Sequence, residues 1–232
     1  MVAPIVMTFN EILHKFRSES FTEHDKGTQF ERLMRLWLLS DPRYSNLTDV
    51  WLWENFPSKG DLGGKDTGID LVARADNGEY WAIQCKCYKE DAVIDKPAVD
   101  SFLATSSRQF LDVDTLQTTS FAHRLWISTT NHWGNNAEEA IKNQNPPLNR
   151  VGLVDLQTSP VDWKLLLDGL QGKDAMLPGK KPREHQLRAM SAAAEYFATN
   201  DRGKLIMACG TGKTYTALKI CLLYTSPSPR DR

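Results

Sequence analysis

The chain has 232 residues, of which 41% are hydrophobic and 25% are charged, with a formal net charge of −1 at pH 7. This is the composition of a globular protein, and the length allows one complete domain and part of another. No apolar run approaches the roughly 18 residues of a membrane-spanning helix, and the N-terminus lacks a signal-peptide pattern, so we expect a cytoplasmic protein with no membrane partner.

Charge is unevenly distributed along the chain. Residues 1–172 contain 17 Lys and Arg against 24 Asp and Glu, whereas residues 173–232 contain 11 against 5. A surplus of negative charge is the opposite of what neutralising nucleic-acid phosphates requires. This pattern argues against a stand-alone nucleic-acid-binding protein, because another part would have to hold the nucleic acid.

The N-terminal segments predict two helices and a strand. Residues 9–16 have apolar side chains at helical spacing, and Thr28 is placed to N-cap a second helix that an Asp-Pro pair would end. Glu31 would then lie in the first turn, where the helix dipole favours a carboxylate. Residues 47–56 are apolar and aromatic, and we expect them to form an edge strand.

Residues 60–88 are the most informative stretch. They comprise a Gly-rich loop, a strand, a turn at Asp76-Asn77-Gly78 and a second strand, and the Asn-Gly pair predicts two residues at φ > 0. Asp70 begins the first strand, while Gln84 and Lys86 share one face of the second because side chains alternate along a strand. A carboxylate, an amide oxygen and an ammonium placed together suit a divalent metal and a phosphodiester.

The pattern Asp70-(x)13-Gln84-Cys85-Lys86, preceded by residues 65–70 (KDTGID), resembles the signature of the Mrr-like PD-(D/E)xK restriction endonucleases. The resemblance covers residues 21–156. It implies a mixed sheet flanked by helices, with Asp70, Gln84 and Lys86 as catalytic residues. It further implies Mg²⁺ bound by Asp70 and the Gln84 carbonyl oxygen, with help from Glu31. The alternatives are a turn-capping Asp70, a solvated Lys86 and a solvated Glu31.

The following segments alternate between helix and strand, which predicts an α/β domain over residues 1–170. Helices are expected from Pro97 to about Phe110, over residues 136–144, and from Ser159-Pro160 onward; strands are expected over residues 124–129 and 151–156, with a loop over residues 131–135. Residues 171–182 are rich in Gly, Lys and Pro, and we interpret them as a linker.

The last part of the chain contains a phosphate-binding pattern. A helix opening at Arg183 is followed by an apolar strand over residues 204–208, the loop Gly210-Thr211-Gly212-Lys213-Thr214 and another helix. Backbone amides of such a loop cradle phosphates, its Lys contacts the β and γ oxygens of ATP, and its Thr hydroxyl binds Mg²⁺.

The run MACGTGKT resembles motif I of superfamily 2 helicases, and Arg183-x-x-Gln186 resembles their adenine-reading Q-motif. Met207 stands where the full phosphate-loop pattern has Gly. Residues 183–220 are therefore expected to be the truncated start of a RecA-like helicase ATP-binding domain. Residues 221–232 resemble a translated sequencing-library adapter, and we interpret them as an artefact at the end of a gene fragment.

Together the two resemblances imply the N-terminal part of an ATP-dependent DNA restriction endonuclease similar to the single-chain type I-like (type ISP) restriction-modification enzymes. The expected partners are double-stranded DNA, the rest of the motor, and methyltransferase and target-recognition domains. Two alternatives stay open: a helicase with a catalytically silent DNA-binding module, and a DNA-repair helicase-nuclease.

Overall fold

The computed structural model describes residues 7–20, 22–63, 68–177, 179, 181–208 and 210–225. Residues 65–67 of the KDTGID motif and residues 226–232 of the expected artefact lie outside the described residues. The chain divides into two compact units, residues 1–177 and 178–232. No described helix has the length and apolar character needed to cross a membrane.

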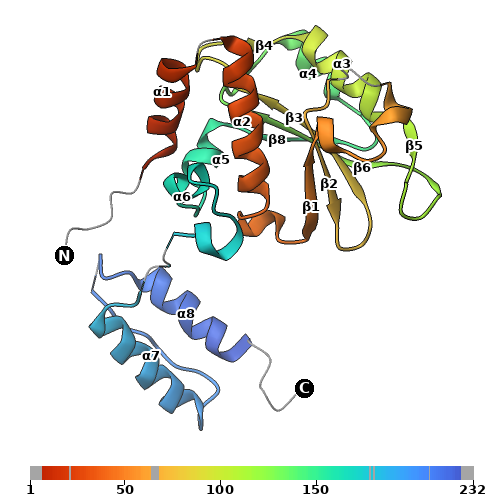
Figure 1. The fold of residues 1–232 in the computed structure, drawn as a ribbon. Helices are drawn as coiled ribbons and strands as arrows, with labels where there is room; N and C mark the ends of the chain where they lie inside the picture. The colour runs from red at the N-terminus through yellow and green to blue at the C-terminus, as the bar shows by residue number, and fades with distance from the viewer. Residues whose placement is uncertain are drawn as a thin grey trace. The chain divides into compact units, whose positions relative to one another are not determined.

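The first unit is built on a six-stranded mixed sheet (Figure 1). Its strand order is β1-β2-β3-β6-β5, with β8 also pairing with β6; β3, β6 and β8 run parallel, and the other pairs are antiparallel. A separate two-stranded sheet pairs β4 with β7. The strands are β1 (Leu47–Leu52), β2 (Leu71–Ala75), β3 (Tyr80–Lys86), β4 (Val93–Ile94), β5 (Gln109–Leu111), β6 (Thr118–Ser128), β7 (His132–Trp133) and β8 (Leu148–Val151).

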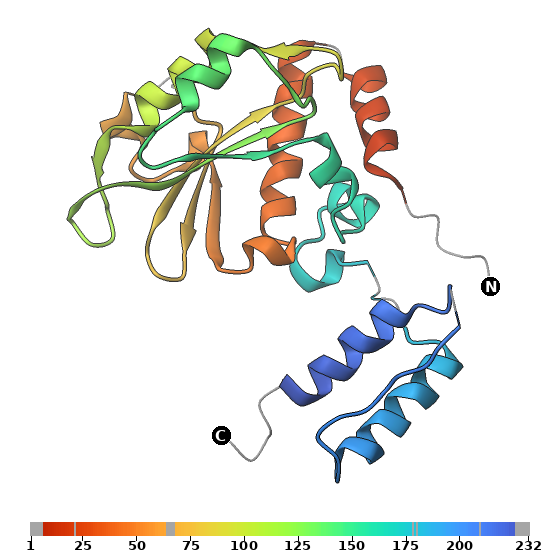
Figure 2. The ribbon, with the colours of Figure 1, turned by 180° about the vertical axis from the view of Figure 1, so that it is seen from behind.

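Helices cover both faces of this sheet. Figure 1 shows α2 crossing one face, and Figure 2 shows α3 and α4 over the other. The helices are α1 (Phe9–Glu19), α2 (Glu23–Leu38), α3 (Lys96–Ser106), α4 (Asn135–Ile141), α5 (Leu153–Gln157) and α6 (Trp163–Leu167). Four short 3-10 helices are η1 (Pro42–Tyr44), η2 (Trp53–Asn55), η3 (Lys59–Leu62) and η4 (Gly172–Ala175).

Two hydrophobic cores follow from the alternation of side chains along the strands. Ile83 and Cys85 of β3 pack in the core shared with α1 and α2, whereas Ala82 and Trp126 pack in the core shared with α3. Gln84 points to the second face and is only 1% exposed. Gln84 therefore lies on the face opposite to Ile83 and Cys85, as predicted.

Helix α2 begins earlier than predicted. Thr22 is its N-cap, with its hydroxyl accepting a hydrogen bond from Asp25 N at 3.0 Å. Thr28 therefore lies inside the helix, and the prediction that Glu31 occupies the first turn is wrong. The Thr-x-x-Asp pattern that begins the helix lies upstream of the apolar repeat on which the prediction relied.

The β2–β3 turn also differs in detail from the prediction. Gly78 has φ +84°, while Asn77 does not adopt a positive φ. Gly78 N donates to Ala75 O at 2.9 Å, and Ala75 N donates to Glu79 O at 2.9 Å. These bonds close a three-residue loop that needs a left-handed residue only at its last position.

Several shorter elements were predicted incorrectly. Phe110 is buried, but it lies in β5 and not on α3. Residues 151–156 are not a strand, because β8 ends at Val151 and α5 begins at Leu153. Residues 132–133, predicted as loop, form β7.

The segment after α6 belongs to the first unit, although its composition indicated a linker. Ala175 is fully buried, Asp162 N donates to Ala175 O at 2.7 Å, and Gly172 N donates to Ser40 Oγ at 2.8 Å. These contacts extend the folded unit through Leu177.

The second unit contains α7 (Glu184–Phe197) and α8 (Lys213–Thr225), joined by an extended segment. The strand predicted over residues 204–208 is not formed, and Leu205 and Ile206 are 42% and 90% exposed. A strand is stable only when a neighbour pairs with its backbone, and the described residues of this unit provide none. Helix α8 continues through residues 221–225.

Candidate active site

Asp70 is fixed at the point where β2 begins. Its Oδ2 accepts hydrogen bonds from Cys85 N at 2.8 Å and from Gln84 Nε2. Its backbone is held too, since Asp70 N donates to Ile83 O at 3.0 Å and Trp53 N donates to Asp70 O at 2.8 Å. The structure thus brings Asp70 and Gln84 together, as the hairpin predicted.

The amide of Gln84 faces Asp70 through its nitrogen and not through the predicted carbonyl oxygen. The nitrogen is a donor and so complements the carboxylate directly. Half a turn of the terminal amide exchanges the two atoms and presents the oxygen on the Asp70 side. A cation bound between Asp70 and Gln84 would favour the rotated amide, in which the oxygen faces the cation.

Lys86 is two residues further along β3 and is half-buried. Within the described part of the chain no carboxylate lies within ion-pairing distance of its ammonium, although its charge lowers the pKa of Glu31. An ammonium held near acidic groups without a direct ion pair can donate hydrogen bonds to an incoming anion.

Glu31 lies in the middle of α2 and faces the same site. Burial is the main cause that raises its pKa to about 7, and the charge of Asp70 raises it further. The Lys86 ammonium acts in the opposite direction. Glu31 and Asp70 also line one pocket, which agrees with the effect of Asp70 on this pKa.

A pocket of about 320 Å³ adjoins Glu31 and Asp70, and sequence reasoning missed part of its lining. Glu31 and Asp70 line it together with His24 and Glu54. His24 precedes Glu31 by seven residues on α2, which places both on one helix face. Glu54 lies in η2 after β1. The sequence predicted one strand over residues 47–56, so it did not indicate that Glu54 lines this pocket.

The approach to Asp70 depends on Gly68. This residue has φ +74°, and a Cβ there would lie 2.9 Å from the backbone of Ser101 and Phe102 in α3. Only Gly allows the chain to pass this close to the helix before turning into β2.

The donor set fits a hard divalent cation. Carboxylates of Asp70 and Glu31 and an amide oxygen of Gln84 are oxygen ligands of the kind that Mg²⁺ prefers, and Mg²⁺ commonly uses one or two carboxylates while retaining several waters. Among the described residues no group of three His, Cys, Asp or Glu side chains forms a complete ligand cage. Asp70, Glu31 and Gln84 therefore offer oxygen ligands that suit a sparsely coordinated Mg²⁺.

The second unit places five of its seven predicted nucleotide-binding residues around one pocket of about 450 Å³. Arg183, Gln186, Gly210, Thr211 and Gly212 line it. The two glycines have φ +76° and +80°, as a tight phosphate-binding loop requires.

Gln186 links the start of α7 to this loop. Its Nε2 donates to Thr211 O at 2.9 Å, and its Oε1 accepts from Arg183 N at 2.9 Å. Lys213 and Thr214 are in the first turn of α8 and are exposed, and neither lines the pocket.

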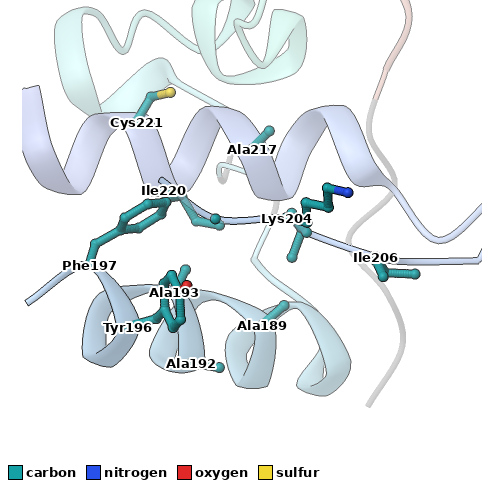
Figure 3. A pocket seen from close by; sticks show the side chains of 12 residues that line it. Ala189, Ala192, Ala193, Tyr196, Phe197, Lys204, Ile206, Ala217, Ile220 and Cys221 are labelled. Carbon is teal, nitrogen blue, oxygen red and sulfur yellow. The ribbon is translucent and has the colours of Figure 1, made fainter. Parts of the chain in front are cut away.

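A larger pocket of about 680 Å³ between α7 and α8 has a different character (Figure 3). Alanine, aromatic and aliphatic side chains dominate its lining, including Ala193, Phe197 and Ile220. A nucleotide needs convergent polar groups that fix its phosphates. The pocket that Gln186 lines supplies such groups, so it is the better nucleotide candidate.

The first unit has the fold of a restriction-endonuclease-like domain: a mixed sheet flanked by helices, with the Asp, Gln and Lys signature at the β2–β3 hairpin. Residues 39–172 match the restriction endonuclease family Mrr_cat_2, and the chain belongs to that family. Residues 179–232 match the family described as type III restriction enzyme, res subunit. These matches confirm both resemblances found in the sequence.

Among solved structures, the chain is similar to the ATP-dependent type ISP restriction-modification enzyme LlaBIII bound to DNA, at 31% identity and a TM-score of 0.67. The alignment covers 96% of this chain but only 13% of LlaBIII. Weaker likenesses are to the DNA modification-dependent restriction endonuclease AspBHI (14% identity, TM-score 0.36, covering 68% of this chain and 34% of AspBHI) and to MspJI in complex with an oligonucleotide (15%, 0.37, 78% and 42%). At these scores the latter two add nothing to the assignment. No curated protein matches the sequence.

Proposed function

We propose that this chain is the nuclease end of a longer ATP-dependent DNA restriction enzyme, called the parent protein below, acting on double-stranded DNA in the cytoplasm. The observations that carry the proposal are the hydrogen bonds that Gln84 and Cys85 donate to Asp70 and the pocket that Asp70 shares with Glu31, with Lys86 two residues beyond Gln84 on β3. Family membership and the likeness to a type ISP enzyme support it. Methyltransferase and target-recognition segments belong to the same proposal.

Asp70 and Gln84 would hold Mg²⁺, with Glu31 contributing a carboxylate or orienting a water. When bound, the ion polarises a scissile phosphate and increases the acidity of water. Lys86 donates hydrogen bonds to the phosphate and offsets the negative charge that grows in the transition state. The hydrogen bond from Cys85 N keeps Asp70 aligned while the Gln84 amide turns.

Charge explains why a motor would be coupled to this site. Residues 1–172 have a surplus of acidic groups, so their attraction for DNA phosphates is weak. Arg183 and Gln186 would bind the adenine of ATP, Gly210 to Lys213 its phosphates, and Thr214 a second Mg²⁺. ATP-driven movement of the parent protein along DNA would then bring the duplex to the nuclease.

The nuclease proposal is tested by supercoiled-plasmid cleavage with the parent protein, Mg²⁺ and ATP. Asp70→Ala and Lys86→Ala should each reduce the rate by about 100-fold or more, because each removes a group that acts on the reacting phosphate. Lys89→Ala, an exposed cation three residues further on, is the matched control. Wild-type rates in either site variant would refute the assignment.

The motor proposal is tested by ATP hydrolysis in the parent protein. Lys213→Ala should abolish hydrolysis because its ammonium would contact the transferred phosphate. Lys219→Ala, which removes a cation from the same helix near the Tyr215 ring, should hydrolyse ATP normally. Hydrolysis by the Lys213 variant at the wild-type rate would contradict the proposal.

A further inference from the structure

A second set of polar side chains lies on the same face of the sheet as Gln84, two strands away. The parallel pairings place Gln84 opposite Trp126 and Trp126 opposite Arg150. Residues paired in this way project from the same face of a sheet. Arg150 on β8 therefore lies on the same face as Gln84, separated from it by Trp126 of β6, which is fully buried.

The Arg150 guanidinium is held in a defined orientation. Its central carbon lies 4.1 Å from the centroid of the Trp133 ring, and its side chain is 35% exposed. A pocket of about 200 Å³ adjoins it, lined also by Trp126, Asn131 and Gly152. A planar guanidinium stacked on an aromatic ring is well suited to bidentate binding of a phosphate.

The Glu138 carboxylate of α4 accepts hydrogen bonds from both terminal nitrogens of the Arg150 guanidinium. Arg150 Nη1 and Nη2 donate to its two carboxylate oxygens at 2.8 and 2.5 Å. The side chains of Arg150 and Glu138 are 35% and 41% exposed, so water screens the attraction between them. A DNA phosphate offers the same bidentate geometry, so exchange of one anion for the other costs little.

The spacing matches a DNA backbone. Neighbouring strands are about 4.8 Å apart, so β8 lies roughly 10 Å from β3. DNA advances about 3.4 Å per nucleotide along its helix axis, so a phosphate at Arg150 would lie at most about three nucleotides from one bound by Lys86.

We propose that Arg150, supported by Trp133, binds a DNA backbone phosphate flanking the cleavage point and exchanges Glu138 for it. The proposal rests on the nuclease function of the Asp70–Gln84–Lys86 site and assigns it a second, positioning contact. In the resting state Glu138 competes with the phosphate, which contributes to the weak DNA affinity of an acidic domain.

Binding of a fluorescent duplex by the parent protein in Ca²⁺, without cleavage, tests the assignment. Arg150→Gln should weaken binding about fivefold to tenfold at low salt and reduce the slope of log K against log salt by about 0.9, since one phosphate contact is lost. Glu138→Gln should tighten binding a few-fold, because it removes the competing anion. Lys142→Gln, an exposed cation that follows α4 and pairs with Glu139, should leave the slope unchanged.

Neutral methylphosphonates at each of the three phosphates on either side of the cleavage point locate the contact. One substitution should weaken wild-type binding as much as Arg150→Gln does and should have no further effect on that variant. An unchanged salt slope in Arg150→Gln, or a weaker binding by Glu138→Gln, would overturn the proposal. If the wild-type parent protein binds the duplex but does not cleave it in Mg²⁺, that result would refute the nuclease function and not the Arg150 contact.

Discussion

Below about pH 7, Glu31 holds a proton that a bound magnesium ion would displace. Its pKa is raised to about 7, first by burial and then by Asp70, whereas an unfolded glutamate ionises near 4.5. Between these values the folded chain binds more protons than the unfolded chain. The free energy of unfolding therefore falls as the pH rises through this window and is level above it.

Glu31→Gln should remove this pH dependence in the metal-free protein. At pH 8 we expect the variant to be more stable than the wild type by roughly 1 to 3 kcal/mol, with the difference vanishing near pH 4. Urea unfolding at several pH values between 4 and 8 measures it, and Glu19→Gln, at an exposed carboxylate of α1, is the control. Parallel stability profiles for wild type and Glu31→Gln would contradict the proposed environment.

The spacing of Asp70 and Gln84 was sufficient to predict that they lie together, because the alternation of side chains along a strand and the short turn fix their positions. His24 and Glu54 could not be found in the same way. Both reach the pocket through elements whose boundaries the apolar pattern placed incorrectly. The direction of the Gln84 amide depends on a hydrogen bond to Asp70 and has no signature in the sequence.

The loop before β2 is an element whose shape depends on one residue. In Gly68→Ala the Cβ would meet the backbone of α3 at 2.9 Å, so the loop must move and Asp70, two residues on, must move with it. We expect a loss of about 1 to 3 kcal/mol in stability and a large loss of plasmid cleavage. Urea unfolding and cleavage rates measure the two effects.

Gly78→Ala separates backbone strain from displacement of the site. Gly78 also has a positive φ, +84°, but a Cβ there has nothing within 4 Å among the described residues. This variant should lose about 1 kcal/mol of stability and still cleave DNA. Equal cleavage by the two Gly variants would show that the Gly68 contact does not position Asp70.

Longer elements were easier to predict than short ones. Helix α7 and strand β3 follow strong patterns, whereas β5 and β7 have only three and two residues and form because β6 and β4 pair with them. Such short strands depend on tertiary pairing and not on local propensity. The alternation of α and β was nevertheless enough to predict the mixed sheet.

At the scale of the whole molecule, the first unit contains both hydrophobic cores and extends through Leu177. A chain of residues 1–177 should therefore unfold with the same free energy as the first unit in the 232-residue chain, within about 0.5 kcal/mol. A chain ending at residue 170 lacks buried Ala175 and the Gly172–Ser40 hydrogen bond, and should be less stable by about 1 to 3 kcal/mol.

Urea unfolding of both truncated chains, followed by tryptophan fluorescence, measures the difference. Equal stability of the two would place the end of the folded unit near residue 170, as the composition had indicated. If the chain of residues 1–177 is markedly less stable than the 232-residue chain, the stability of the first unit depends on residues 178–232.

The β2–β3 hairpin has a practical consequence for following this domain in solution. Its turn, residues 76–78, and Asp70 lie at opposite ends of β2, and a five-residue strand spans about 17 Å. The turn is exposed and Gly78 has open space around it. A small fluorophore attached at Asn77 would therefore sit beyond the reach of the chemistry and still report on the rigid hairpin that carries the active site.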